Sequence, residues 1–434
     1  MSFKKYASEM YVDKKLSALG AVDKATMNQA IAEAITTALA NLSTLPTVTA
    51  NDDGKMMVVR NGSWVMEEYE PCSCATTSIY GVSWDLSASN RTTRTDAAAD
   101  FADPVPSVAG SDGSSPFDTL MPWAGMEIVE DEDIGVLVSI PKFYYKITKT
   151  DTELKMQIAD GPAEGFSVSP AHADRGDGKG ERDVVYIARY KCVGDKGASV
   201  SGAAPVVNMT RSGVRDLITE QAIDGLSMQD YAMFWTTRML MMVEYATWDM
   251  QGAIGYNCGN GSSRENTGAT DAMTYHTGTV QDSLDTYGVG VQYRWIEDPW
   301  GNVAEWVDGW RVEESAEEGM TWDVYVTTNP AEFSDTEGGV KIGSLPEAVC
   351  SGVMISDWTI PSADGYDWAM IPASGTIEIE VGNEYCADYC EFSGPCLSVG
   401  GICEPAPYFG AFSLGSYVAS LSAGHIGARL QKIP

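Results

Sequence analysis

The stretch WGNVAEW, residues 300–306, carries the strongest fold information in the chain. Its aromatic and branched side chains, Trp300, Val303 and Trp306, are expected to fill a core that short strands cannot close alone. Asn302 can satisfy the backbone groups of a turn with its side-chain amide. This stretch therefore predicts a tight turn that leads into a buried strand.

Two further stretches point to the same core. LSVGG, residues 397–401, is typical of a strand followed by a turn, and IGARL, residues 426–430, of a terminal strand. The glycines Gly400, Gly401 and Gly427 suit a close backbone approach or a positive φ. We expect all three stretches to belong to one framework.

Composition excludes several classes of protein. The chain has 434 residues, 44% of them hydrophobic, with 61 acidic against 28 basic residues and a net charge of −33. This acidity would repel a nucleic-acid backbone and an anionic membrane surface. No stretch is apolar enough to insert into a membrane, and the first residues lack the apolar region of a signal peptide. We therefore expect synthesis in a cytoplasm, export by no standard signal, and free thiols for the nine cysteines.

Changes in composition and residue pattern along the sequence predict three parts. Residues 1–46 are rich in helix formers and are expected to be a helical assembly segment. Residues 47–77 contain KMMVVRNGSWVMEEY, in which Asn61-Gly62 separates two strand-like runs, so a small β-hairpin module is expected. Residues 78–434 combine short strand-like runs and turn clusters with few long helices, which predicts an irregular α+β domain.

The first part carries an apolar stripe at helical spacing. Asp23 can cap this helix, and Pro46 ends it. The stripe comprises Met27, Ile31, Ile35 or Ala34, Ala38 and Leu42. So short a helix must bury its stripe, either on the main domain or on copies of itself in a dimer or trimer.

One long helix is predicted within the main domain, over residues 227–250. Ser227 and Asp230 form a shortened capping box, and a Met- and aromatic-rich stripe that follows indicates a core helix rather than a cofactor site. The Pro-, Gly- and Asp-rich stretches 95–116 and 172–183 are expected to be solvated loops.

Sequence signatures of common catalytic and metal sites are absent. His172, His276 and His425 are far apart, and no H-x-x-x-H, C-x-x-C, phosphate-binding glycine loop or G-x-S-x-G motif occurs. Four cysteines, Cys386, Cys390, Cys396 and Cys403, cluster near the C-terminus. Their spacing does not match a zinc site, so we expect partly buried small hydrophobic residues.

Together, WGNVAEW, LSVGG and IGARL resemble the C-type lectin fold of the formylglycine-generating, sulfatase-modifying family. The resemblance covers roughly residues 78–434 and implies an α+β domain of short twisted strands with two helices. The catalytic branch carries a cysteine pair after its glycine turn. Here Cys403 stands alone, so the resemblance does not extend to copper-dependent oxidation, and we expect no enzymatic activity.

The C-terminal pattern is more similar to the non-catalytic branch of phage tail-tip adhesins and diversity-generating-retroelement variable proteins. The matching positions are Leu397, Val399, Gly400, Gly401, Gly410, Phe412, Ser420, Ile426, Gly427, Ala428, Arg429 and Leu430. From residue 385 to 426 the chain lacks Asn, Lys, Gln, Thr, Met, Trp and Arg. Adenine-directed mutagenesis would deplete several of these residues, although Glu404 does not fit; chance composition is the alternative.

This resemblance implies a receptor-binding protein of a phage tail, with an outward C-terminal surface on a fixed frame. The expected ligand contacts are Ile402, Glu404, Pro405, Pro407, Tyr408, Tyr417, Val418, Leu421 and His425. Tyr408 and Tyr417 are the expected anchors. The expected frame residues are Trp300, Gly301, Asn302, Glu305, Trp306, Gly400, Gly401, Gly427 and Arg429.

The expected partners are a host cell-surface receptor, protein or glycan, and other tail proteins, in a homotrimer that is part of the virion. No cofactor is expected, although acidic loops leave room for a structural Ca²⁺. Two alternatives stay open: a structural tail component without a receptor, and an oxidase of the sulfatase-modifying type.

Overall fold

The computed structural model describes residues 77–86, 92–258, 264–377, 388–401 and 409–434, together with the backbone of two strands near the N-terminus. The chain divides into two compact units, Met1–Thr76 and Thr77–Pro434. Their boundary lies one residue from the start predicted for the lectin-like domain. The helix predicted within residues 1–46 lies outside the described residues.

The predicted hairpin is present in the first unit. Strand β1 (Lys55–Arg60) pairs antiparallel with β2 (Ser63–Glu68), and the register places Arg60 opposite Ser63. Two residues therefore connect the strands, as the Asn61-Gly62 pair predicts.

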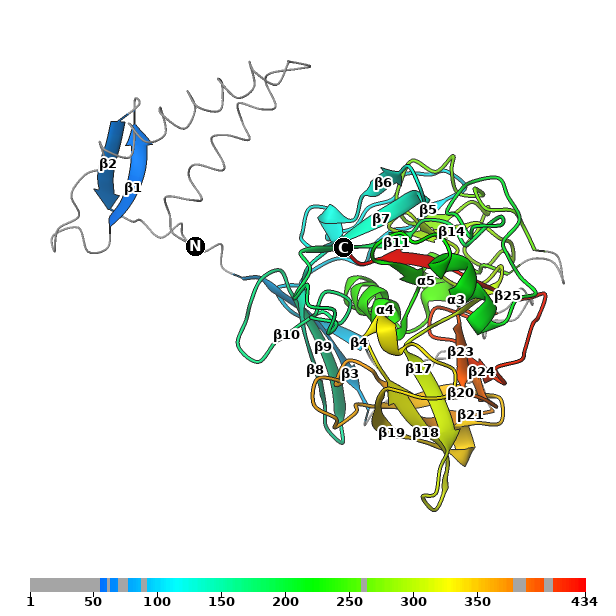
Figure 1. The fold of residues 1–434 in the computed structure, drawn as a ribbon. Coiled ribbons are helices and arrows are strands. Elements are labelled where there is room, and N and C mark those ends of the chain that lie inside the picture. Colours follow the sequence, from blue (N-terminus) through cyan, green and yellow to red (C-terminus); the bar gives the residue numbers. More distant parts are fainter. Residues whose placement is uncertain are drawn as a thin grey trace, which may run out of the picture. The chain divides into compact units, whose positions relative to one another are not determined.

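The second unit contains five sheets of mostly short strands (Figure 1). A five-stranded antiparallel sheet has the order β10 (Ser167–Val168), β8 (Tyr144–Lys149), β9 (Glu153–Ala159), β3 (Ile79–Asp85), β4 (Thr92–Asp96). A second has the order β12 (Leu226–Met228), β26 (Leu430–Lys432), β11 (Val184–Ala188), β7 (Gly135–Pro141), β6 (Ile128–Asp131). A four-stranded sheet has the order β15 (Ile296–Glu297), β14 (Val291–Tyr293), β13 (Gly278–Thr279), β5 (Ser107–Val108). A three-stranded sheet has the order β17 (Trp310–Glu314), β18 (Met320–Val326), β19 (Val340–Pro346).

The largest sheet has seven strands and contains most of the C-terminal motif. Its order is β21 (Ile371–Thr376), β20 (Val353–Thr359), β22 (Tyr389–Phe392), β24 (Leu414–Tyr417), β23 (Cys396–Val399), β16 (Ala304–Trp306), β25 (Ile426–Ala428). The pairs β22–β24 and β16–β25 are parallel. Many short strands with few helices agree with the predicted α+β class.

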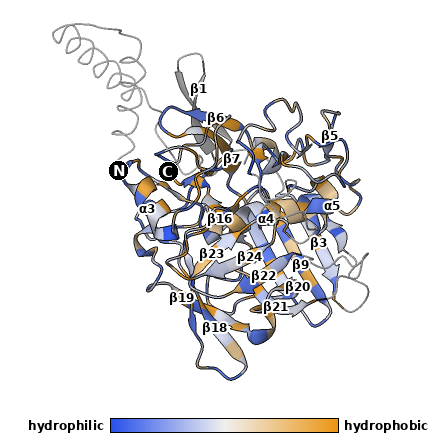
Figure 2. Ribbon diagram, turned by 90° about the vertical axis from the view of Figure 1, so that its right-hand side faces the viewer, coloured by the Kyte–Doolittle hydropathy of each residue, from blue (hydrophilic) through white to orange (hydrophobic). Residues whose placement is uncertain are grey.

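A wholly buried helix, α4 (Tyr231–Tyr245), lies at the centre of the unit. It packs against β3 and β9, and Trp235 contacts Trp358 of β20 edge-on at 5.4 Å between ring centroids. Figure 2 shows the helix beside these strands. The prediction of a core helix is confirmed, because every residue of α4 is buried.

The ends of this helix differ from the prediction. Asp230 is the N-cap and accepts a hydrogen bond from the Met233 N–H, whereas Ser227 lies in β12 and accepts from Gln431. The helix ends at Ala246, which has a φ of 52°, and a separate short helix, α5 (Met250–Ile254), follows. With α3 (Arg211–Thr219), the described unit has three α-helices where two were predicted.

The two predicted solvated loops are partly buried. Residues 95–116 contribute β5 to a sheet. In residues 172–183, Arg175 is 1% exposed and forms an ion pair with Asp230, while Arg182 is 4% exposed and donates to the Pro434 carbonyl. Glycines shape this loop as expected, but its arginines fasten it to the core, which composition alone does not reveal.

Candidate functional site

The three motif stretches, which lie between residues 300 and 430, form adjacent strands of the seven-stranded sheet. Strand β16 pairs parallel with β25, with Glu305 opposite Gly427, and antiparallel with β23, with Glu305 opposite Val399. In Figure 1, β23, β24 and β25 lie together on one side of the unit. These three strands and β16 are called the frame below.

The predicted turn before β16 is present, but the Asn302 side chain bonds to the backbone of Glu265, 37 residues away, and not to the backbone of the turn. Trp300 is fully buried, and Gly301 and Asn302 have φ values of 70° and 58°. The Asn302 side chain accepts from the Glu265 N–H at 3.1 Å and donates to the Glu265 carbonyl at 3.1 Å. A Cβ on Gly301 would lie 1.7 Å from the Asn257 carbonyl oxygen, so only glycine fits there.

Glycines of the other two stretches also meet their predicted requirements. Gly400 and Gly401 have φ values of 80° and 66°, in the left-handed region that glycine favours. A Cβ on Gly427 would lie 2.5 Å from the Val206 carbonyl oxygen, so this position needs a close backbone approach.

A buried charge cluster holds the frame together. Glu305, on β16, accepts from Arg429 Nε at 3.0 Å and from Lys191 Nζ at 2.5 Å. Burial alone would raise the pKa of Glu305, but the charges of Arg429 and Lys191 lower it to about 2. The sequence placed Glu305 and Arg429 in the frame but gave no signal for Lys191, which comes from a loop after β11.

Arg429 also satisfies backbone carbonyl groups where several elements meet. Its guanidinium donates to the carbonyls of Ala188, Arg189, Glu297 and Asp298 at 2.7–3.0 Å. The side chain is 1% exposed. A single residue thus connects β25, β11, β15 and β16.

A second buried carboxyl, missed at the sequence level, holds the chain between β23 and β24. Asp388 accepts from the Gly410 N–H at 3.1 Å and from the Phe412 N–H at 2.6 Å. Burial raises the pKa of Asp388 to about 8. This side chain therefore fixes the backbone that enters β24.

The structure describes four of the nine predicted ligand contacts. Outside the described residues lie Ile402, Glu404, Pro405, Pro407 and Tyr408. Val418 is 53% exposed and His425 is exposed, so both are accessible to a ligand, and their ligand contact stays a prediction. Tyr417 and Leu421 are half-buried; Tyr417 packs edge-on against Trp306 at 6.2 Å, so it combines packing with partial exposure instead of pointing wholly outward.

The described cysteines of the C-terminal cluster behave as small hydrophobic residues. Cys390 and Cys396 are free thiols, as predicted, and they are fully buried where only partial burial was expected. Burial raises the pKa of Cys396 to about 11, which opposes thiolate formation. Cys386 and Cys403 lie outside the described residues.

Comparison with known proteins gives no family assignment. No protein-family model matches the chain, and no curated protein matches it.

Among the described residues, no group of three or more His, Cys, Asp or Glu side chains is arranged to hold a metal ion, so the structural Ca²⁺ stays a prediction. In the same part of the chain, no helix combines the length and apolar character needed to cross a membrane.

Proposed function

We propose that the protein is a non-catalytic receptor-binding protein, an adhesin of a phage tail tip or tail fibre with a C-type lectin-like domain. The observation that carries this proposal is the contrast within the C-terminal region. Frame side chains such as Glu305 and Arg429 are buried and bonded to one another, while Val418 and His425 between the frame strands are exposed.

This contrast has a physical consequence for binding. Two connections lie between the frame strands, one from β23 to β24 and one from β24 to β25. Both therefore start and end on hydrogen-bonded strands. The display segment is defined as the exposed positions of residues 402–425 outside β24. Substitutions there should alter the surface with little effect on stability. The absence of seven residue types from residues 385–426 is consistent with diversification of this surface.

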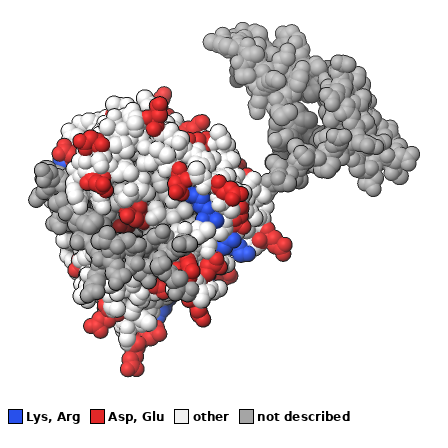
Figure 3. Space-filling model, turned by 180° about the vertical axis from the view of Figure 1, so that it is seen from behind, with Lys and Arg blue, Asp and Glu red and all other residues white. Residues whose placement is uncertain are grey.

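The proposed partners are a host cell-surface protein or glycan and other tail proteins within the virion. Acidic side chains outnumber basic ones on the face shown in Figure 3, which disfavours an anionic polymer as the receptor. Residues 1–46 are proposed to assemble a homotrimer, which would strengthen weak single-site binding by avidity.

Cell binding tests the proposal. A fluorescently labelled full-length chain is incubated with a panel of bacterial strains, and a variant with Val418 and His425 replaced by alanine is compared with wild type. The matched control is Glu318→Ala, an exposed position on the distant β17–β18 turn. We expect wild type and control to bind the same strains and the display variant to bind at least about tenfold more weakly. Equal binding by both variants would refute the assignment.

Genome sequence provides a second, independent test of the diversification part. A nearby reverse-transcriptase gene and a near-identical repeat of the sequence encoding the display segment are expected. If the repeat is absent, the protein can still be an adhesin, but its surface is not diversified by this mechanism.

A further inference from the structure

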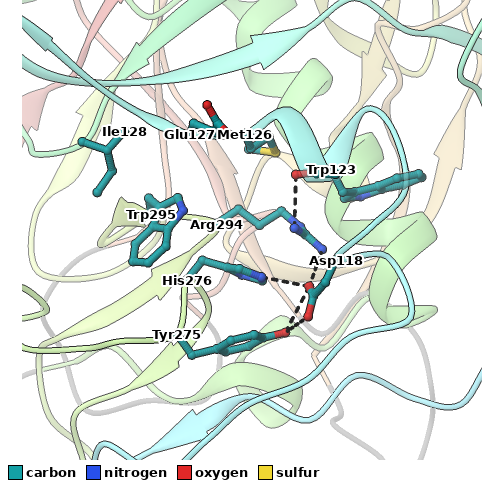
Figure 4. Close-up of a pocket in the computed structure, with 10 residues that line it drawn as sticks. Asp118, Trp123, Met126, Glu127, Ile128, Tyr275, His276, Arg294 and Trp295 are labelled. Atoms are coloured by element: carbon teal, nitrogen blue, oxygen red, sulfur yellow. Dashed lines mark hydrogen bonds and ion pairs between the residues drawn. The ribbon is translucent and has the colours of Figure 1, made fainter.

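A cavity lies at the turn between β14 and β15. Its volume is about 540 Å³, within the range of small-molecule sites. Figure 4 shows the side chains around it. The lining residues are Asp118, Trp123, Ala124, Met126, Glu127, Ile128, Tyr275, His276, Arg294 and Trp295.

Two bulky residues form the turn itself. Arg294 and Trp295 have φ values of 42° and 70°, which side chains of this size rarely adopt, and such two-residue turns usually contain Asn or Gly. The Arg294 N–H donates to Thr277 Oγ1 at 3.0 Å, and the Trp295 N–H donates to the His276 carbonyl at 2.9 Å. Strain of this kind clusters at binding sites, and here it presents both side chains to the cavity.

Aromatic rings form one wall of the cavity. The Tyr275 and His276 rings lie 4.1 Å apart, and the His276 and Trp295 rings meet edge-on at 5.9 Å. Met126 and Ile128 lie on another side, and Ile128 is 40% exposed. Aromatic faces opposite apolar side chains suit a ligand with methyl groups.

The charge of this site is negative. Arg294 pairs with Glu244 at 2.6 Å and with Asp118 at 3.3 Å, so two carboxylates face one guanidinium. Burial and the Arg294 charge lower the pKa of His276, which leaves that ring uncharged at neutral pH. Glu127 is exposed at the mouth and adds another negative charge. Arg189, 6.0 Å from the Trp295 ring, is a further cation near the site, and it is paired with Asp271.

The hydrogen-bonding capacity of Asp118, by contrast, is used up within the protein. Asp118 accepts from the Ser115 N–H, Tyr275 Oη, His276 Nε2 and Arg294, which together occupy about four lone-pair sites of a carboxylate. The Tyr275 and His276 donors are also engaged in these bonds. The cavity thus offers negative charge and aromatic faces but few free hydrogen-bonding groups.

We propose that this cavity binds a quaternary ammonium group, such as the trimethylammonium head of choline. A quaternary ammonium has no N–H to satisfy, and it is attracted both by aromatic rings and by negative charge. A primary ammonium would need acceptors that Asp118 no longer has free. The negative charge of Glu127 at the mouth selects against a phosphate next to the ammonium, so free choline is preferred to phosphocholine.

Calorimetric titration of the full-length protein at constant ionic strength tests this site. The probes are choline chloride, tetramethylammonium chloride, ethanolamine, phosphocholine and glucose. We expect choline and tetramethylammonium to bind at least about tenfold more tightly than ethanolamine, and glucose not to bind. Ethanolamine equal to choline, phosphocholine tighter than choline, or no binding of choline would each overturn the proposal.

Two variants separate binding from folding. Trp295→Leu keeps an apolar side chain but removes the indole, and it should weaken choline binding at least about tenfold. Glu127→Gln changes an exposed side chain that folding does not need, and it should weaken choline binding about two- to threefold. The control Glu318→Gln should leave binding unchanged. Unaltered choline affinity in Glu127→Gln and in folded Trp295→Leu would refute the site, whatever the display variants do in cell binding.

Discussion

Replacement of Arg429 by methionine should destabilise the frame severely. Methionine has a similar length, but it removes the charge that faces Glu305 and the donors to the backbone carbonyls of Ala188, Arg189, Glu297 and Asp298. Glu305 keeps its contact with Lys191, so its carboxylate retains one positive partner.

The size of the effect follows from these contacts. Loss of one partner of a buried ion pair costs about 3–5 kcal/mol, and Lys191 places this case near the lower end. Carbonyl groups left without a donor add about 1 kcal/mol in total at the low end of measured values. We therefore expect a loss of about 4 kcal/mol, a large part of a typical stability of about 5–15 kcal/mol. For a domain of this size the melting temperature should fall by roughly 5 °C.

Urea and thermal unfolding of the full-length chain measure this loss. The matched controls are Val418→Ala and His425→Ala, exposed positions of the display segment, which should each stay within about 0.5 kcal/mol of wild type. Arg429→Lys should be intermediate, because its ammonium keeps the charge near Glu305 but cannot reach all the carbonyls. A loss below about 1 kcal/mol for Arg429→Met, or an equal loss for His425→Ala, would refute the distinction between frame and display segment.

Three other changes test the same framework. The pKa of Glu305 is lowered to about 2, so its contribution of about 3 kcal/mol to stability should be complete above pH 4.5 and disappear as pH falls towards 2. The free energies of unfolding of Glu305→Gln and wild type, measured in urea, should therefore converge in acid. The pKa of Asp388 is raised from 3.8 to about 8, so its contribution to stability should be complete below about pH 3.8 and be lost as pH rises to 8. Asp388→Asn, which loses one acceptor, should cost about 1–2 kcal/mol at pH 4 and less at pH 9, by denaturant unfolding. Gly427→Ala places a Cβ 2.5 Å from the Val206 carbonyl oxygen and should cost about 1–3 kcal/mol in thermal unfolding, whereas Gly424→Ala, with its nearest atom at 3.5 Å, should cost little.

Local features of the fold could be predicted from sequence. The β1–β2 hairpin and the buried helix α4 each depend on residues close together in the chain, a turn dipeptide and a helical stripe. The turn at Asn302 was also predicted, but its side chain bonds to Glu265, 37 residues away. The exact ends of α4 could not be predicted, because Ser227 is drawn into β12 by pairing with the C-terminal strand β26.

Long-range partners could not be predicted in the same way. Lys191 and Glu305 are 114 residues apart, and the cavity combines Asp118 with Arg294, 176 residues away. No periodicity or spacing connects such pairs, since only the completed topology brings them together. His276 was visible in the sequence as one of three scattered histidines, but its neighbours were not.

Buried arginines explain how so many short strands and long loops form a stable core. Short strands leave many backbone carbonyls without a sheet partner, and an arginine offers five N–H donors in a fixed plane. Arg211 donates to the carbonyls of Val307 and Trp310, and Arg238 to those of Ala411 and Pro299. Arg94, Arg175, Arg182, Arg294 and Arg429 make similar bonds.

This use of arginine also shapes the surface. The chain has only 28 basic residues against 61 acidic ones, and the buried arginines place their guanidinium groups inside the core. Fewer positive charges are then left to balance the exposed carboxylates. The same residues that satisfy the backbone of the frame therefore leave an acidic exterior, which favours cationic or neutral ligands both at the display segment and at the cavity beside Trp295.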